Sequence, residues 1–103
     1  MFHQVDEYLN YLVVEKGVSR NTIDAYSRDI NRYAEFILQR GVEQMTKAVP
    51  DDVIAFLTEM RKKGLQTASI NRTLASLRSF YKFMIREGMA SENPAARIDP
   101  GKI

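Results

Sequence analysis

Four stretches of this sequence carry apolar residues at intervals of three and four, and each stretch ends at a glycine. That spacing places the apolar side chains on one face of an α-helix, because an α-helix has 3.6 residues per turn. Glycine adopts the left-handed backbone conformation that commonly follows a helix, so it is a usual stop signal. The four terminal glycines are Gly17, Gly41, Gly64 and Gly88. The pattern predicts four helices.

The predicted helices start at recognisable residues. Ser19 is a typical N-cap for the second helix, Pro50 suits the first position of the third, and the fourth begins near Thr67 or Ala68. The predicted apolar faces are, in chain order, Phe2, Val5, Leu9, Leu12 and Val13; Ile23, Tyr26, Ile30, Tyr33 and Ile37; Val53, Phe56, Leu57 and Met60; and Ile70, Leu74, Leu77, Tyr81 and Met84.

The domain predicted from this pattern is all-α. No segment alternates between apolar and polar residues, and no Asn-Gly or Asp-Gly hairpin turn occurs. At 103 residues the chain has room for one core, which we assign to residues 1–98. Residues 99–103 begin with Asp-Pro-Gly, which is expected to interrupt the preceding helical structure and to start a linker. Phe83 is apolar but lies on the polar side of the fourth helix, and the simplest cover for it is the segment 89–98.

Several classes of function are disfavoured by the composition. There is no long apolar run for a membrane span and no secretory signal, and the absence of cysteine excludes disulfides and thiolate metal sites and fits a cytoplasmic protein. His3 is the only histidine, and no cluster of residues has metal-ligand spacing. Asp51 and Asp52 are explained by the dipole of the third helix. We therefore expect no catalytic residue, metal or cofactor in this chain.

The fourth predicted helix carries an unusual polar face. The net charge of the whole chain is only +2, but residues 69–86 contain four cations and no acid. The side opposite the apolar face is formed by Ala68, Arg72, Ala75, Ser76, Ser79, Lys82 and Arg86. Short side chains let a helix approach a surface closely, while Arg and Lys reach phosphates or base edges. This composition suits the major groove of DNA, although a solvated face that is poor in acids is an alternative.

The second helix has a mixed polar face formed by Asn21, Asp24, Arg28, Asn31, Arg32 and Glu35. Its first turn, Ser19 to Thr22, offers hydroxyl, amide and guanidinium donors beside free backbone N–H groups, which attract anions. Ser19 is also explained as an N-cap alone. The turn at Thr67, Ala68 and Ser69 offers a similar combination. Two such N-termini and one cationic face together favour the binding of double-stranded DNA.

Four segments of the chain resemble a known family in order and spacing. They are EKGVSRNTIDAYSRDINRYAEFI at 15–37, DDVIAFLTEMRKKG at 51–64, ASINRTLASLRSFYKFMIREG at 68–88 and NPAARI at 93–98. The combination of S-x-N-T-x-x-A-Y, S-I-N-R-x-L-x-x-L-R-x-F-Y and N-P-A is similar to the N-terminal core-binding domain of tyrosine recombinases of the bacterial Xer type. The resemblance covers residues 2–98.

The resemblance implies a four- to five-helix SAM-like orthogonal bundle that forms half of a clamp around a recombination half-site. Its second and fourth helices would cross the major groove, with Thr22, Ala25 and Arg28, and Ala68, Arg72 and Ser76, toward DNA. Asp24 and Glu35 fit this placement of the second helix less well. The family's strand cleavage uses a tyrosine, arginines, a lysine and histidines of a second domain, and those motifs do not occur in these residues. Tyr81 belongs to the core-binding pattern and is not expected to be the nucleophile.

The sequence thus predicts a DNA-binding domain of a tyrosine recombinase, without enzyme activity of its own. The predicted DNA-binding residues are Arg20, Asn21, Thr22, Ala25, Arg28, Thr67, Ala68, Ser69, Arg72, Ser76, Ser79 and Lys82. The resemblance also implies a tetramer on DNA for the full-length protein, whereas the isolated domain is expected to be a monomer without membrane contact. The alternative is a helical protein-interaction module whose cationic face binds an acidic partner.

Overall fold

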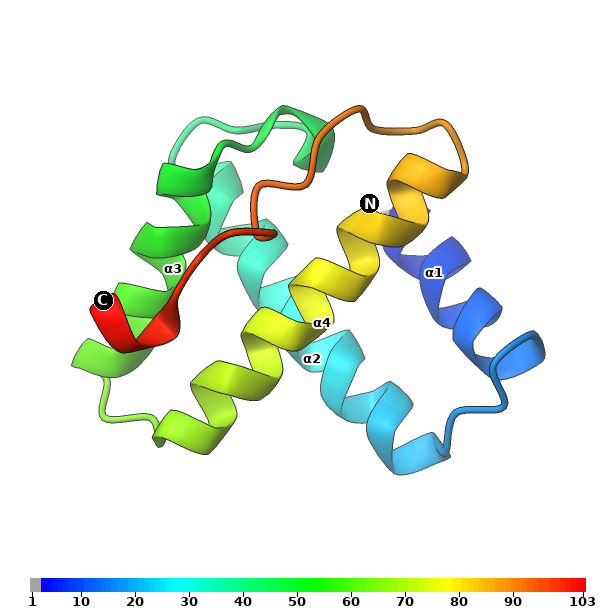
Figure 1. Cartoon of the computed structure of the whole chain (residues 1–103), viewed down its shortest axis with the longest axis horizontal. Coiled ribbons are helices and arrows are strands. Elements are labelled where there is room, and N and C mark those ends of the chain that lie inside the picture. The colour runs from blue at the N-terminus through cyan, green and yellow to red at the C-terminus, as the bar shows by residue number, and fades with distance from the viewer. Residues whose placement is uncertain (1–2) are drawn as a thin grey trace.

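A computed structural model describes residues 3–103, which form four α-helices and two short 3-10 helices with no strand in that range (Figure 1). The elements are α1 (His3–Val14), α2 (Arg20–Gln39), η1 (Met45–Lys47), α3 (Pro50–Lys62), α4 (Thr67–Arg86) and η2 (Pro100–Lys102). The all-α prediction is confirmed. Phe2, which was assigned to the first apolar face, lies outside the described residues. No helix within residues 3–103 is long and apolar enough to cross a membrane.

The helix boundaries follow the local signals in the sequence. The side chain of Ser19 accepts a hydrogen bond from the backbone N–H of Thr22 at 3.4 Å, so it caps α2 as predicted. Pro50 is the first residue of α3. Gly88 follows the end of α4 with a φ of +76°, a conformation that a residue with a Cβ adopts only under strain.

Helix α4 lies at the centre of the fold. It contacts α1, α2, α3 and η2, and it crosses in front of α2 in Figure 1. All five residues of its predicted apolar face are buried. Because neighbours cover α4 from several directions, the buried arc is wider than that face and also includes Thr73, Ser76, Phe80 and Phe83. Only a narrow strip of α4 is left for solvent.

Two predictions about the core are wrong. Val13 is 52% exposed, and the buried face of α1 is formed by Val5, Tyr8 and Leu12. The ring of Phe83 packs against Tyr8 and Tyr11, with ring centroids 5.5 and 4.9 Å away. Helix α1 therefore provides the cover that the sequence assigned to residues 89–98.

The segment after α4 folds back between α3 and α4 and is held by arginine. The guanidinium of Arg78 donates hydrogen bonds to the carbonyl oxygens of Ala95, at 2.9 Å, and of Ile98. Asn93 donates to the carbonyl oxygen of Arg78 at 3.2 Å. At the expected break, the carboxylate of Asp99 accepts from the N–H of Gly101 at 2.9 Å and starts the 3-10 turn η2. The role of these last residues as a linker stays a prediction.

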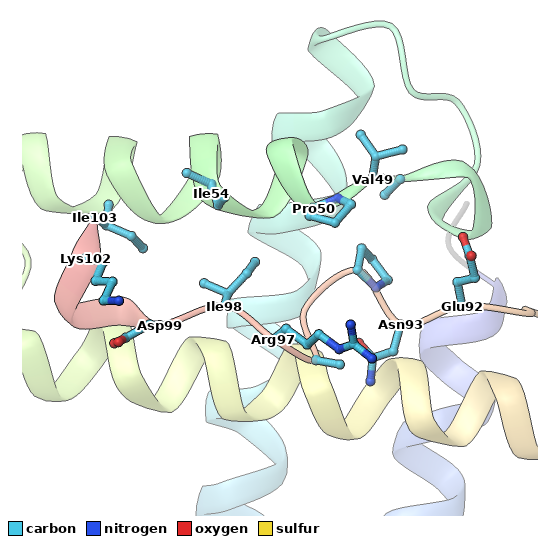
Figure 2. Close-up of a pocket in the computed structure, with 13 residues that line it drawn as sticks. Val49, Pro50, Ile54, Glu92, Asn93, Arg97, Ile98, Asp99, Lys102 and Ile103 are labelled. Carbon is cyan, nitrogen blue, oxygen red and sulfur yellow. The ribbon is translucent and has the colours of Figure 1, made fainter.

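This segment and the start of α3 enclose a half-open hollow of about 880 Å³ (Figure 2). Val49, Pro50 and Ile54 line one side, and Ile98 and Ile103 lie opposite them. Its charged residues, which include Arg97 and Asp99, are exposed at the rim. The hollow is an apolar surface feature rather than an acid–base site.

A chain of buried hydroxyl groups joins α2, α4 and η1. The hydroxyls of Tyr33 and Tyr81 lie 2.8 Å apart, and the hydroxyl of Tyr81 donates to the carbonyl oxygen of Met45 at 2.8 Å. Because a tyrosine hydroxyl has one proton, Tyr33 must be the donor to Tyr81. Both tyrosines are fully buried, and burial raises the pKa of each phenol. The network satisfies every hydroxyl that it contains.

The direction of this network predicts unequal effects of two similar substitutions. Tyr81→Phe removes both the acceptor of Tyr33 and one of the two donors to the Met45 carbonyl oxygen, which keeps the N–H of Ala48 at 3.2 Å. The buried hydroxyl of Tyr33 is left unpaired. Tyr81→Phe should lower the free energy of unfolding by about 2–4 kcal/mol, whereas Tyr33→Phe, which strands no donor, should cost about 1 kcal/mol. Urea denaturation followed by circular dichroism measures both. Equal losses would contradict the assigned direction of the hydrogen bonds.

A second prediction concerns alkaline pH. Burial raises the pKa of Tyr8 to about 12, above the usual value of 10.0. The unfolded chain then releases this proton at lower pH than the folded chain, so stability is complete below pH 10 and falls as the pH rises toward 12. Urea denaturation at a series of pH values gives the free energy of unfolding as a function of pH. Between pH 10 and 12, Tyr8→Phe should make the decline of this free energy with pH less steep by up to about 1.4 kcal/mol per pH unit. Identical slopes for the two proteins would refute it.

Candidate nucleic-acid interface

Helices α2 and α4 form the scaffold of the predicted site. They cross each other, and both begin at the lower edge of the view in Figure 1. On the sides that do not face each other or the core, each helix keeps exposed residues. The exposed predicted residues are Arg20, Asn21 and Arg28 on α2, and Thr67, Ala68, Arg72 and Lys82 on α4. Thr22, Ala25, Ser69 and Ser79 are half-buried.

Arg72 bridges the two helices through an ion pair. Its Nε and Nη2 atoms donate to the two carboxylate oxygens of Asp29 at 2.9 and 3.0 Å. The side chain of Asp29 is 2% exposed, whereas that of Arg72 is 41% exposed. These hydrogen bonds raise the pKa of the Arg72 guanidinium. Arg72 thus stays on the surface, but its position is set by a buried carboxylate.

The prediction from sequence did not include Asp29, although the sequence contains a signal for it. Asp29 lies three residues after Tyr26 and four before Tyr33, so helical periodicity puts it on the apolar face of α2. A carboxylate in that position requires a charged or hydrogen-bonding partner. The signal indicates that a partner exists, but it does not identify Arg72, which is 43 residues away.

Ser76 does not lie on the exposed face. It is fully buried, and its hydroxyl donates to the carbonyl oxygen of Thr73 at 2.7 Å. The placement of Ser76 on a DNA-facing surface is wrong, because neighbouring elements cover this side of α4. Ser79 is half-buried and its hydroxyl oxygen accepts a hydrogen bond from Tyr8 at 2.6 Å.

A groove of about 640 Å³ runs between the end of α1, the first half of α2 and the last half of α4. We call it the cationic groove, because three basic side chains line it: Lys16, Lys82 and Arg86. It brings together Thr22, Ser79 and Lys82 of the predicted site, which come from two different helices. Tyr26 supplies a further hydroxyl-bearing ring. The sequence prediction missed Lys16 and Tyr26 as members of one surface.

Aromatic contacts organise one end of the cationic groove. The guanidinium of Arg86 lies 4.5 Å from the centroid of the Tyr11 ring and donates to its hydroxyl at 3.1 Å. Arg86 also pairs with Glu87 at 3.2 Å, where both side chains are exposed. The ammonium of Lys16 lies 6.0 Å from the same ring. Tyr11 therefore holds two cations at the mouth of the groove.

The four cations of α4 divide into two groups. Arg72 is neutralised by Asp29, and Arg78 donates to the carbonyl oxygens of the folded-back segment. Lys82 has no ion pair within residues 3–103, and Arg86 has only an exposed partner. The free positive charge of α4 is consequently concentrated at the cationic groove.

This arrangement has the chemistry of an anion-binding surface. Ammonium, guanidinium and hydroxyl groups are donors to phosphate oxygens. Within residues 3–103 no group of three or more metal-ligating side chains lies close enough together to hold a metal ion. The turn at Thr67 begins α4 without a side-chain cap, since its N-cap residue, Gln66, makes no such hydrogen bond.

Comparisons with known proteins agree with the motifs in the sequence. A family model described as phage integrase, N-terminal SAM-like domain, matches residues 5–88. The tyrosine recombinase XerC of Anoxybacillus flavithermus is 42% identical over 89 residues, which are 86% of this chain and 30% of the relative. The tyrosine recombinase XerD of Chlorobaculum tepidum is 36% identical over 99 residues, which are 96% of this chain and 32% of the relative.

This chain spans about one third of the length of the curated relatives that it matches. The matched region includes α1 from Val5 onward and all of α2, α3 and α4, and therefore the crossing of α2 and α4, the Asp29–Arg72 pair and the cationic groove. Together with the helical fold, the match shows that the chain belongs to the family of phage integrase N-terminal SAM-like domains, and that its relatives are tyrosine recombinases.

Proposed function

We propose that this domain binds double-stranded DNA and clamps one side of a recombination half-site for a tyrosine recombinase. The single observation that carries the proposal is the surface formed by the crossing helices α2 and α4, where Arg72 and the cationic groove lie close to exposed small side chains. Strand cleavage and rejoining would belong to other parts of the full-length protein.

The shape of this surface supports contact with a DNA groove. An α-helix fits the major groove when its exposed side chains are short or can donate to bases and phosphates. On α4 the exposed strip contains Ala68 and Ala75 on either side of Arg72. On α2 the half-buried Ala25 and the exposed Arg28 continue the surface. Asp24 is exposed beside Arg20, 4.0 Å from its Nε, which weakens its repulsion of phosphates.

The cationic groove supports contact with the DNA backbone. Phosphate contacts position a protein on DNA and provide most of its non-specific affinity. Lys16, Lys82 and Arg86 line the groove together with the hydroxyl groups of Thr22, Ser79 and Tyr26. We assign the groove to one strand of phosphates and the strip around Arg72 to the floor of the adjacent major groove.

The names of the relatives support a role in recombination. Two of them are tyrosine recombinases named XerC and XerD. We propose that the full-length protein acts in the same class of reaction, in the cytoplasm, as a tetramer on DNA, with this domain as its DNA-binding part. The rival function is the binding of an acidic protein segment in the cationic groove, and the next experiment separates the two.

Titration of the 103-residue chain with duplex DNA tests the proposal. We expect a Kd of roughly 10⁻⁴ to 10⁻⁶ M at physiological salt, because only one side of a clamp is present. Neutralisation of three phosphates by Lys16, Lys82 and Arg86 should give a slope of about −2.7 for log K against log salt. Fluorescence anisotropy at several salt concentrations measures it. Tight binding to polyglutamate without salt-sensitive binding to DNA would favour the rival.

A matched pair of lysine substitutions tests the location of the phosphate contacts. Lys82→Ala should weaken DNA binding and reduce the salt slope by about 0.9, because it removes one phosphate contact. Lys47→Ala removes the same charge from η1. The groove is lined by the first half of the 20-residue helix α2, whereas η1 follows the last residue of that helix, so this substitution should change neither the affinity nor the salt slope. Anisotropy titrations of the three proteins supply the comparison. Equal effects of the two substitutions would remove the groove from the interface.

A further inference from the structure

The ion pair between Asp29 and Arg72 leaves part of the arginine unused. A guanidinium group carries five N–H donors, one on Nε and two on each Nη atom. Asp29 occupies the edge formed by Nε and Nη2. The second edge, formed by Nη1 and the other N–H of Nη2, has no hydrogen-bond partner within residues 3–103. Since the Arg72 side chain is 41% exposed, a ligand can reach this edge.

The position of that free edge is strongly restrained. Asp29 is almost completely buried and interacts with Arg72 through both carboxylate oxygens. Rotation of Arg72 away from this position would leave a buried carboxylate without a partner, which is unfavourable. Arg72 therefore loses less conformational freedom on binding than an unrestrained surface arginine.

We propose that Asp29 is a positioning residue, which holds Arg72 so that its free edge donates two hydrogen bonds to O6 and N7 of a guanine in the major groove. This inference rests on the proposed DNA-binding function and assigns a base-reading role within it. Two parallel N–H donors match the two acceptors of guanine in spacing and direction.

Charge favours a base edge over a phosphate as the acceptor. The Asp29–Arg72 pair has no net charge, so it contributes little to the attraction of a phosphate, and the carboxylate repels one at short range. Hydrogen bonds to a neutral guanine edge do not need that net charge. Ala68 and Ala75, one turn before and one turn after Arg72, are exposed and extend no further than Cβ, so a base edge can approach the free donors.

The test begins with selection of preferred sequences from a pool of random 20-base-pair duplexes by the 103-residue chain. We expect one guanine to be retained, and its replacement by adenine should weaken binding about 10-fold or more. Replacement by 7-deazaguanine, which lacks N7, should also weaken binding. Replacement by inosine, which keeps O6 and N7 and changes only the minor groove, should have no effect. This pair of analogues separates reading of the major-groove edge from other contacts.

Asp29→Asn then tests the positioning role. Without the carboxylate, Arg72 gains an uncompensated positive charge and loses its fixed orientation. Binding to random duplexes should become tighter, with a salt slope steeper by up to about 0.9, while the preference for the selected guanine should fall toward 1-fold. Simple structural damage would instead weaken binding to both kinds of DNA. Circular dichroism verifies that the variant is folded.

Arg72→Lys provides a second variant, which keeps a positive charge beside the buried Asp29 but lacks the planar pair of parallel N–H donors of a guanidinium group. It should keep the affinity for random duplexes within about 2-fold and lose the guanine preference, and it carries the test if Asp29→Asn does not fold. Three outcomes would overturn the inference without contradicting DNA binding. They are selection of no guanine, retention of the guanine preference in a folded variant, and weaker binding of a variant to both the selected and the random duplexes. Absence of salt-sensitive binding to any duplex would overturn the proposed function as well.

Discussion

The burial of α4 is the constraint on which the rest of this structure depends. A helix that contacts α1, α2, α3 and η2 must present apolar or internally satisfied side chains over most of its circumference. The buried arc of α4 meets this condition with aliphatic and aromatic residues, with Ser76, whose hydroxyl bonds within the helix, and with Tyr81, which bonds Tyr33 and Met45. The exception is Thr73, whose buried hydroxyl has no hydrogen-bond partner within residues 3–103. Only a narrow strip remains for contact with a ligand, so every exposed residue on it has a large effect on what the domain can bind.

The same constraint explains how the basic residues of α4 are used. Arg78 lies at the edge of the buried arc and donates to the carbonyl oxygens of the segment that covers it. Arg72 lies where α4 meets α2, and a buried carboxylate accepts its donors. Lys82 and Arg86 lie beyond the crossing, beside the end of α1, and they form the cationic groove with Lys16. A helix with a formal charge of +4 over residues 69–86 thus supplies a structural hydrogen-bond donor, an oriented surface donor, one cation without an ion pair within residues 3–103 and one cation with only an exposed partner.

Much of the fold could be predicted because its signals are local. The apolar spacing, the N-cap Ser19, the N-terminal Pro50 and the terminal glycines identified α2, α3 and α4 within a residue or two. Errors occurred where two helices meet. Val13 was assigned to the core and Ser76 to the surface, because periodicity defines a helix face but does not define how much of its circumference the neighbours cover. Phe83 was correctly identified as needing cover, but the cover comes from Tyr8 and Tyr11 of α1.

For the site, the sequence by itself determined the inventory: the cations of α4, the donors in the first turn of α2, the absence of cysteine and the motifs of the phage integrase N-terminal family. Only the tertiary structure decided which of these groups act together. Asp29 and Arg72 are 43 residues apart in the sequence, and they pair only because α2 packs against α4. Lys16 and Lys82 line the same groove only because α1 packs against α4. The physical reason is that side-chain chemistry and helix periodicity are properties of short segments, whereas charge pairing and groove shape arise when distant segments are brought together by burial of the core.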